Sequence, residues 1–249
     1  MRIIPVLDVL NGQVVRGIAG KRDSYQPIQS ILTPDADIGS VCTAFQQELG
    51  ISEYYIADLD GIERGKPNYD ALMSVQDALN RVWLDAGFSS VSRLDVFDQH
   101  LSVHQLYRVI VGLECCSDLN DLTLLLRKVG SQRLVFSLDL QNGSPLLSAD
   151  ASADWRQAAP FEIAEQVIHL GIEKMIVLDL AAVGMGQGTP TLELCGALKQ
   201  KYPQLEIITG GGVNSAEDLA RLESCCDAAL LASAIHDGRL TIDDLKPYQ

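Results

Sequence analysis

The sequence lacks a long apolar run, and it lacks a segment that resembles a secretion signal. No stretch approaches the roughly 18 consecutive apolar residues of a membrane-spanning helix. The opening segment MRIIPVLDVLNG passes from one arginine directly into a strand-like pattern, without the small-residue cleavage site of a signal peptide. We therefore expect a soluble cytoplasmic protein with no membrane partner.

Basic residues are scarce in this chain of 249 residues. It has 19 Lys and Arg against 33 Asp and Glu, a formal net charge of −14, and no local basic cluster offsets this balance. Such a chain repels nucleic acids and anionic membranes, so we expect neither as a partner. A small anionic ligand then has to be held by oriented backbone amides rather than by a basic surface.

The cysteines and histidines form none of the spacings typical of a disulfide framework or a zinc site. The six cysteines include two adjacent pairs but no Cys-x-x-Cys, and we expect free, buried thiols. His100 and His104 have no carboxylate-bearing motif beside them, so a solvated helix face is the favoured interpretation. We expect no bound metal.

What the sequence does have is an alternation of short, β-rich apolar runs with amphipathic segments, which is typical of repeated βα units around a parallel sheet. Apolar residues make up 47% of the chain, enough for a sizeable core. Eight runs have strand character: 3–9, 54–59, 81–85, 107–112, 134–140, 174–180, 205–209 and 228–232. Helical spacing is seen between them, for example in 37–49, 69–79, 160–170, 191–201 and 215–222.

Eight strands, each followed by a helix, fit the length of a closed (β/α)₈ barrel of about 250 residues. No linker-like stretch marks a domain boundary. We therefore predict an α/β fold in which residues 1–249 form a single (β/α)₈ TIM barrel.

The second half of the chain repeats the pattern of the first. PVLDVLNG at 5–12 resembles FSLDLQNG at 136–143, and the aspartates in these segments, Asp8 and Asp139, are 131 residues apart. YIADL at 55–59 likewise matches IVLDL at 176–180, and GFSS at 87–90 corresponds to GVNS at 212–215. This repetition predicts a pseudo-two-fold barrel with half-barrels of about 1–130 and 131–249.

Asp8 and Asp139 are the candidate catalytic residues. Each ends an apolar run and precedes an Asn-Gly turn, which would place two carboxylates on opposite sides of the active face of the barrel. Such a pair suits proton transfer, with one residue as general acid and the other as general base. The alternative is that each aspartate only caps the turn that follows it.

A candidate phosphate site follows the last two predicted strands. The segment TGGGVNSAEDL at 209–219 is a strand end, a glycine turn and a helix start, and ASAI at 232–235 would face it. Glycines let backbone amides approach an anion closely, and barrels often hold phosphate between these two loops. We expect phosphate to bind at the amides of Gly211, Gly212, Ala232 and Ser233. A glycine turn used only for tight geometry is the alternative.

These segments, together with DLDGIERGKPNY at 58–69, resemble the histidine-biosynthesis (β/α)₈ barrels, and the resemblance runs through essentially the whole chain. The pattern is closer to the isomerase branch, the phosphoribosylformimino-AICAR ribotide isomerases, than to the cyclase branch. The resemblance implies an Amadori rearrangement of a phosphorylated substrate, with Asp8 as base and Asp139 as acid. It also implies substrate contacts by Arg16 and Trp155. For Trp155 a packing role is the alternative. This chemistry needs no redox cofactor, so we expect none.

The chain departs from the family pattern in the first half. Where relatives carry a second phosphate site, Gly-Gly-Gly-Ile-Arg-Ser, this chain reads DAGFSS at 85–90, with Glu114 after the next strand. Asp85 and Glu114 would repel a phosphate group. After the sixth strand a usual threonine becomes Leu178. We therefore expect a substrate with one phosphate.

Three hypotheses follow. The first is the family's isomerase reaction on an aminoaldose phosphate. The second is a diverged paralogue with another reaction, in one-carbon or pterin cofactor metabolism. The third is a non-catalytic barrel that binds a phosphorylated metabolite. The retained pair Asp8 and Asp139 argues against the third, whereas Asp85 and Leu178 argue against the first in its unmodified form. The oligomeric state is left open.

Overall fold

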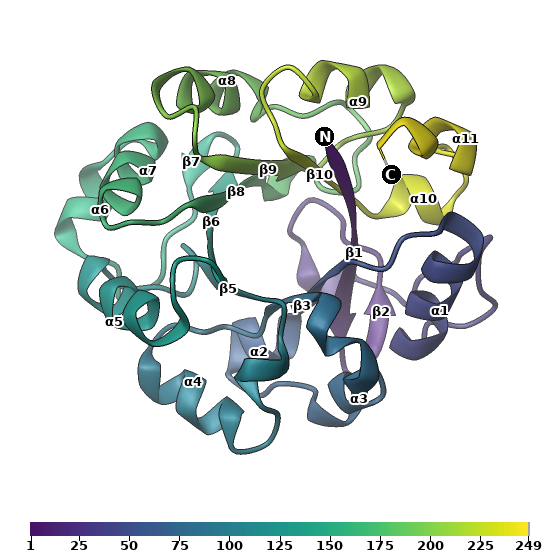
Figure 1. Cartoon of the computed structure of the whole chain (residues 1–249), viewed down its shortest axis with the longest axis horizontal. Helices are drawn as coiled ribbons and strands as arrows, with labels where there is room; N and C mark the ends of the chain where they lie inside the picture. Colours follow the sequence, from purple (N-terminus) through teal and green to yellow (C-terminus); the bar gives the residue numbers. More distant parts are fainter. Residues whose placement is uncertain (249) are drawn as a thin grey trace.

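The computed structural model describes residues 1–248 and shows a closed barrel of eight parallel strands, a single (β/α)₈ TIM barrel (Figure 1). The barrel closes because β10 pairs in parallel with β1. All eight predicted strands are present, each with ends within one residue of the prediction. They are β1 (Arg2–Leu10), β3 (Tyr54–Asp58), β4 (Val82–Asp85), β5 (Arg108–Gly112), β6 (Leu134–Gln141), β8 (Lys174–Asp179), β9 (Glu206–Gly210) and β10 (Ala228–Leu231).

Helices surround the barrel on all sides (Figure 1). Their positions agree with the predicted helical segments except at 69–79, where a helix of five residues and a separate 3₁₀ turn (Gln76–Arg81) replace the single predicted helix. The helices are α1 (Ile38–Leu49), α2 (Leu59–Arg64), α3 (Tyr69–Met73), α4 (Val91–Asp98), α5 (Leu119–Val129), α6 (Ala153–Gln157), α7 (Pro160–His169), α8 (Leu192–Lys201), α9 (Ala216–Leu222), α10 (Ser233–His236) and α11 (Ile242–Leu245). Among the described residues 1–248, no helix is long and apolar enough to span a membrane.

The pseudo-two-fold repeat appears in two matching hairpins. Short strands β2 (Gln13–Val15) and β7 (Ser144–Pro145) fold back antiparallel on β1 and β6. Both turns are Asn-Gly with left-handed backbone: φ is 51° and 78° at Asn11 and Gly12, and 52° and 77° at Asn142 and Gly143. Asn-Gly favours this turn because both residues tolerate positive φ. The hairpins therefore project at equivalent places, directly after Asp8 and Asp139.

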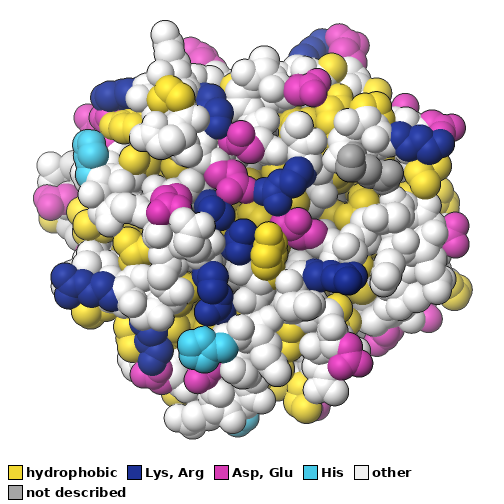
Figure 2. Space-filling model, in the orientation of Figure 1, with side chains coloured by type: hydrophobic (Ala, Val, Ile, Leu, Met, Phe, Trp, Pro, Cys, Tyr) yellow, Lys and Arg dark blue, Asp and Glu magenta, His cyan; other side chains and the backbone are white. Residues whose placement is uncertain are grey.

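Two apolar layers hold the barrel together. One lies between the strands and the helices, and the other fills the barrel interior with side chains that include Ile4, Trp83, Ile110 and Ile176. At the end where the strands begin, charged side chains of both signs gather over the centre (Figure 2). They include the ion pairs that Arg2 and Lys174 form with Glu206. This packing closes that end and leaves the interior open only where the strands finish.

Candidate functional site

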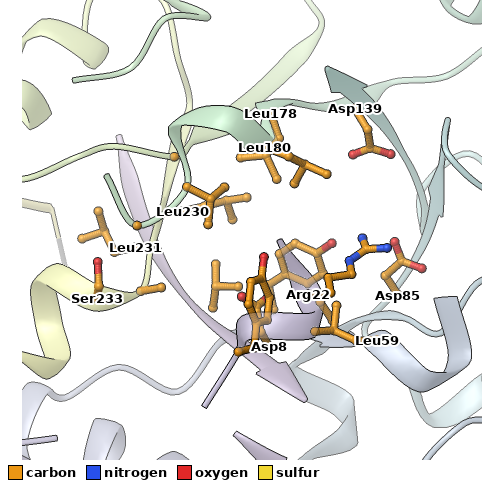
Figure 3. A pocket seen from close by; sticks show the side chains of 18 of the residues that line it. Asp8, Arg22, Leu59, Asp85, Asp139, Leu178, Leu180, Leu230, Leu231 and Ser233 are labelled. Atoms are coloured by element: carbon orange, nitrogen blue, oxygen red, sulfur yellow. The ribbon is translucent and has the colours of Figure 1, made fainter. Parts of the chain in front are cut away.

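A cavity opens at the carboxyl ends of the barrel strands. Asp8 on β1 and Asp139 on β6 lie on opposite walls, as Figure 3 shows. The sequence prediction that the repeat brings these two carboxylates to one cavity agrees with this placement.

Neither aspartate caps the Asn-Gly turn that follows it. The amide of Asn11 donates instead to Asp60 Oδ2 at 2.6 Å. In the second half, Asp179 accepts from the amides of Asn142 at 3.0 Å and Gly143 at 2.7 Å. The carboxylates of Asp60 and Asp179 thus stabilise the two turns. The side chains of Asp8 and Asp139 line the cavity instead.

Asp8 is partly buried, and its carboxylate lies close to the backbone of Gly17. A Cβ at Gly17 would lie 2.5 Å from Asp8 Oδ2, so the absence of a side chain there makes room for the carboxylate. Burial raises the pKa of Asp8 to about 6, although the nearby Arg22 guanidinium opposes this shift. A carboxyl with this pKa is largely ionised at neutral pH and is basic enough to accept a proton.

Asp139 has a different environment and is 5% exposed. Its Oδ1 accepts a hydrogen bond of 2.6 Å from the Ser137 hydroxyl, and its Oδ2 receives a long contact of 3.4 Å from the amide of Glu114. Burial and the neighbouring Glu114 carboxylate raise the pKa of Asp139 well above its ordinary value. This shift is in the direction of the protonated form, which a general acid requires.

The opposite end of the cavity is lined by backbone donors. Gly211, Gly212, Val213, Ala232 and Ser233 all contribute to its wall. Within residues 1–248, the amides of the last four have no acceptor from the protein. Unpaired amides at the rim of a cavity can each donate a hydrogen bond to a phosphate oxygen. Phosphate binding at these amides stays a prediction.

The corresponding place in the first half is already occupied by the protein's own carboxylate. Asp85 Oδ1 accepts the amide hydrogen of Gly87 at 2.9 Å, which removes a donor that an anion would need. The Phe88 ring is 1% exposed and packs edge-on against Phe97, with ring centroids 5.1 Å apart. The amide of Gly87 is therefore already paired within the protein, and a buried phenyl ring follows it.

An arginine that the sequence did not reveal enters the cavity between these acidic groups. Arg22, from the 3₁₀ turn Arg22–Ser24, makes a two-pronged ion pair with Glu114, with distances of 3.0 and 2.6 Å. The partners are 92 residues apart in the chain, so no local pattern indicates the contact. Arg22 is the one basic side chain in the cavity lining of the described chain.

The barrel fold agrees with the similarity of the whole chain to known proteins. A model described as histidine biosynthesis protein matches residues 2–241. The chain belongs to this family.

Relatives within the histidine biosynthesis family are similar over nearly their whole length. A protein of Leuconostoc mesenteroides is 27% identical over 98% of both chains, and one of Syntrophomonas wolfei is 29% identical over 98% of this chain and 96% of its own. Both are named imidazole-4-carboxamide isomerases, with two 5-phosphoribosyl groups in the name. A protein of Methanocaldococcus jannaschii, 32% identical over 98% of this chain and 97% of its own, is uncharacterized.

Two residues expected to contact substrate from the family resemblance lie outside the cavity. Arg16 lines an adjoining hollow that shares Ala232 and Ser233 with it, and its guanidinium lies 3.9 Å from the Asp237 carboxylate. Trp155 has no exposed surface, and its indole N–H donates to Gln166 Oε1 at 3.1 Å. A fully buried ring has no face for a ligand, so the structure corrects the stacking role of Trp155 to a packing role.

The cysteines and metal-ligating residues add no second site. The six thiols are free, and five are buried while Cys115 is only partly so. Within residues 1–248, no three His, Cys, Asp or Glu side chains are grouped so that they could hold a metal ion.

Proposed function

We propose that this member of the histidine biosynthesis family is an isomerase that rearranges an aminoaldose carrying one phosphate group to the corresponding aminoketose. Asp139 would act as general acid and Asp8 as general base. The observation that carries the proposal is the placement of these two carboxyls on opposite walls of one cavity, with the pKa of each raised by burial. The names of the relatives support isomerase chemistry of this kind.

The proton transfers balance within the substrate. Asp139 donates a proton to the ring oxygen as the bond between that oxygen and C1 breaks, and the nitrogen lone pair forms a C=N double bond. Asp8 then removes the proton from C2, which gives an enaminol. Tautomerisation of the enaminol yields the ketose, and return of the proton from Asp8 to Asp139 through product and solvent restores the enzyme.

One phosphate rather than two follows from the unequal ends of the cavity. The four unpaired amides at Gly212, Val213, Ala232 and Ser233 suit an anion. At the other end, Asp85 and the Glu114 carboxylate would repel a second phosphate. Removing these like charges from water would weaken binding of that phosphate further.

Complementation of a histidine auxotroph that lacks the isomerase tests the substrate. We expect no restored growth, while the purified protein converts a singly phosphorylated aminoaldose to its ketose, followed by nuclear magnetic resonance. Restored growth would show that the doubly phosphorylated histidine intermediate is accepted and would overturn the single-phosphate proposal. Failure to convert any of a panel of aminoaldose phosphates, with retained phosphate binding, would favour a binding protein instead.

The pH dependence of the rate reports on Asp8. Because Asp8 must be ionised to act as base, kcat/KM should rise with pH and reach about half its maximum near pH 6, the pKa of that carboxyl. Arg22→Met removes the guanidinium that lowers this pKa, so the rising limb should move to higher pH. Lys128→Met, which removes a surface charge paired with Asp95, serves as the control and should leave the limb in place. If the rising limb of kcat/KM stayed at the same pH in Arg22→Met, a group other than Asp8 would be responsible for it.

A further inference from the structure

At the end of the cavity remote from the amides, two oxygen atoms that face the cavity have no hydrogen-bond donor from the described residues. Asp85 is 3% exposed, and although its Oδ1 accepts from Gly87, its Oδ2 has no donor within residues 1–248. A Cβ built on Gly112 would lie 3.4 Å from this oxygen and 2.9 Å from Asp139 Oδ2. These two carboxyl oxygens therefore converge beside one glycine, where no side chain separates them.

A second, independent observation at this end is the hydroxyl of Tyr55. The ring belongs to the apolar interior of the barrel, the residue is 6% exposed, and it lines the cavity. No polar atom of residues 1–248 forms a hydrogen bond with the hydroxyl. Burial and the surrounding carboxylates, Asp85 first among them, raise the pKa of Tyr55 well above its ordinary value, so the hydroxyl stays neutral. The hydroxyl lines the cavity with no partner among the described residues, so it is available to bind a ligand atom.

The charge of this end is not balanced by the protein. Asp8, Asp85, Glu114 and Asp139 line the cavity. Among the described residues, Arg22 is the one basic side chain in its lining, and it already pairs with Glu114. Burial, together with the Glu114 carboxylate, raises the pKa of Asp85 to about 7, as expected where cationic charge is lacking. A ligand with a positive end would supply what the protein does not.

The middle of the cavity separates this end from the phosphate end. Figure 3 shows Ser233 and Leu231 on one side and Asp85 and Asp139 on the other, with apolar side chains between them: Leu178, Leu180 and Leu230. A ligand that spans the cavity therefore meets donors, then an apolar stretch, then acceptors.

We propose that the acid-lined end takes a protonated amine, so that the ligand is a phosphate monoester with an ammonium group at its far end. In an aminoaldose phosphate, the substituent on the C1 nitrogen would carry this ammonium, while the C1 nitrogen itself stays neutral and drives ring opening. Asp85 and the Tyr55 hydroxyl bind the ammonium hydrogens. This inference rests on the proposed function in one respect, namely that phosphate binds at the amides of Gly212, Val213, Ala232 and Ser233.

Binding of simple probes tests the amine end separately from catalysis. Isothermal titration calorimetry would compare ω-aminoalkyl phosphates with two to six carbons against ω-hydroxyalkyl phosphates of equal length, with inorganic phosphate as reference. We expect the amine of the best length to bind about tenfold or more tighter than its hydroxyl partner, as a buried charge-assisted hydrogen bond predicts.

Substitutions of Asp85 and Tyr55 test whether these two side chains cause the preference for the amine probe. Asp85→Asn keeps an oxygen for the Gly87 amide but removes the charge, and it should abolish the preference for the amine without weakening inorganic phosphate. Tyr55→Phe should reduce the preference partly. Asp95→Asn, on the surface helix α4 and paired with Lys128, is the matched control and should change nothing.

The outcomes separate the two proposals. Equal affinity of amine and hydroxyl probes at every length would overturn the amine inference and leave the phosphate end intact. A preference for the amine that persists in Asp85→Asn would also overturn it, because the carboxylate would then have no part. Failure of phosphate and of both probe series to bind would instead overturn the proposed function.

Discussion

Replacing Asp8 or Asp139 with Asn should lower the turnover of an aminoaldose phosphate by about 10²-fold or more in each case, which is typical of a positioned acid or base. Asn keeps the shape of the side chain but cannot carry the proton. The substrate should still bind, because the proposed phosphate contacts are with backbone amides at the other end of the cavity. In steady-state kinetics, each variant should therefore show a lowered kcat and a near-normal affinity for the substrate.

The effects of Asp8→Asn and Asp139→Asn on the turnover rate should not be additive. The acid and the base serve successive steps of one reaction, so the double variant Asp8→Asn with Asp139→Asn should be little slower than the worse single variant. Asp95→Asn, far from the cavity on α4, controls for the loss of one carboxylate and should retain full rate. If both single variants kept near-normal rates on a converted substrate, the acid–base assignment would be wrong, and the two carboxyls would have another role.

Much of the fold was predictable from the sequence because a parallel barrel buries both faces of every strand. The strands at 134–140 and 174–180 are nearly continuous apolar runs, which local composition is sufficient to detect. The half-barrel repeat was predictable for a different reason: Asn-Gly turns demand positive φ at equivalent places, and few other residues supply it. The segment 69–79 was predicted as one helix, because apolar spacing cannot show where a helix breaks.

The candidate site was predictable only in part. Asp8 and Asp139 follow from the repeat, and the amide-lined end follows from the glycines at Gly211 and Gly212. Arg22 could not be predicted, because its partner Glu114 is 92 residues away and its turn has no periodic pattern. Tyr55 lies in a segment with strand character, and the sequence does not show whether its hydroxyl has a partner. For Trp155 the family resemblance implies a substrate contact, whereas its ring is buried in the core.

The phosphate end should depend most strongly on Gly212. Its φ is +89°, and a Cβ there would overlap the carbonyl oxygen of Gly188, whose amide also donates to the Gly212 carbonyl at 3.1 Å. In Gly212→Ala, holding alanine in the left-handed backbone conformation therefore costs about 1–2 kcal/mol, and the added Cβ also displaces the loop that contains Gly188. The amides of Gly212 and Val213 would move with it.

Losing two hydrogen bonds to a charged ligand, each of about 1.5 kcal/mol, predicts phosphate binding about 10²-fold weaker in Gly212→Ala. Titration calorimetry with inorganic phosphate measures this directly, and circular dichroism checks that the variant is folded. Gly50→Ala is the matched control: φ is +67° at the end of α1, and no atom lies within 4 Å of the added Cβ. It bears the backbone cost alone, so it should lower the melting temperature and leave phosphate affinity unchanged. A folded Gly212→Ala that binds phosphate as tightly as the unmodified protein would show that the anion is held elsewhere, and that this glycine turn serves only the geometry of the loop.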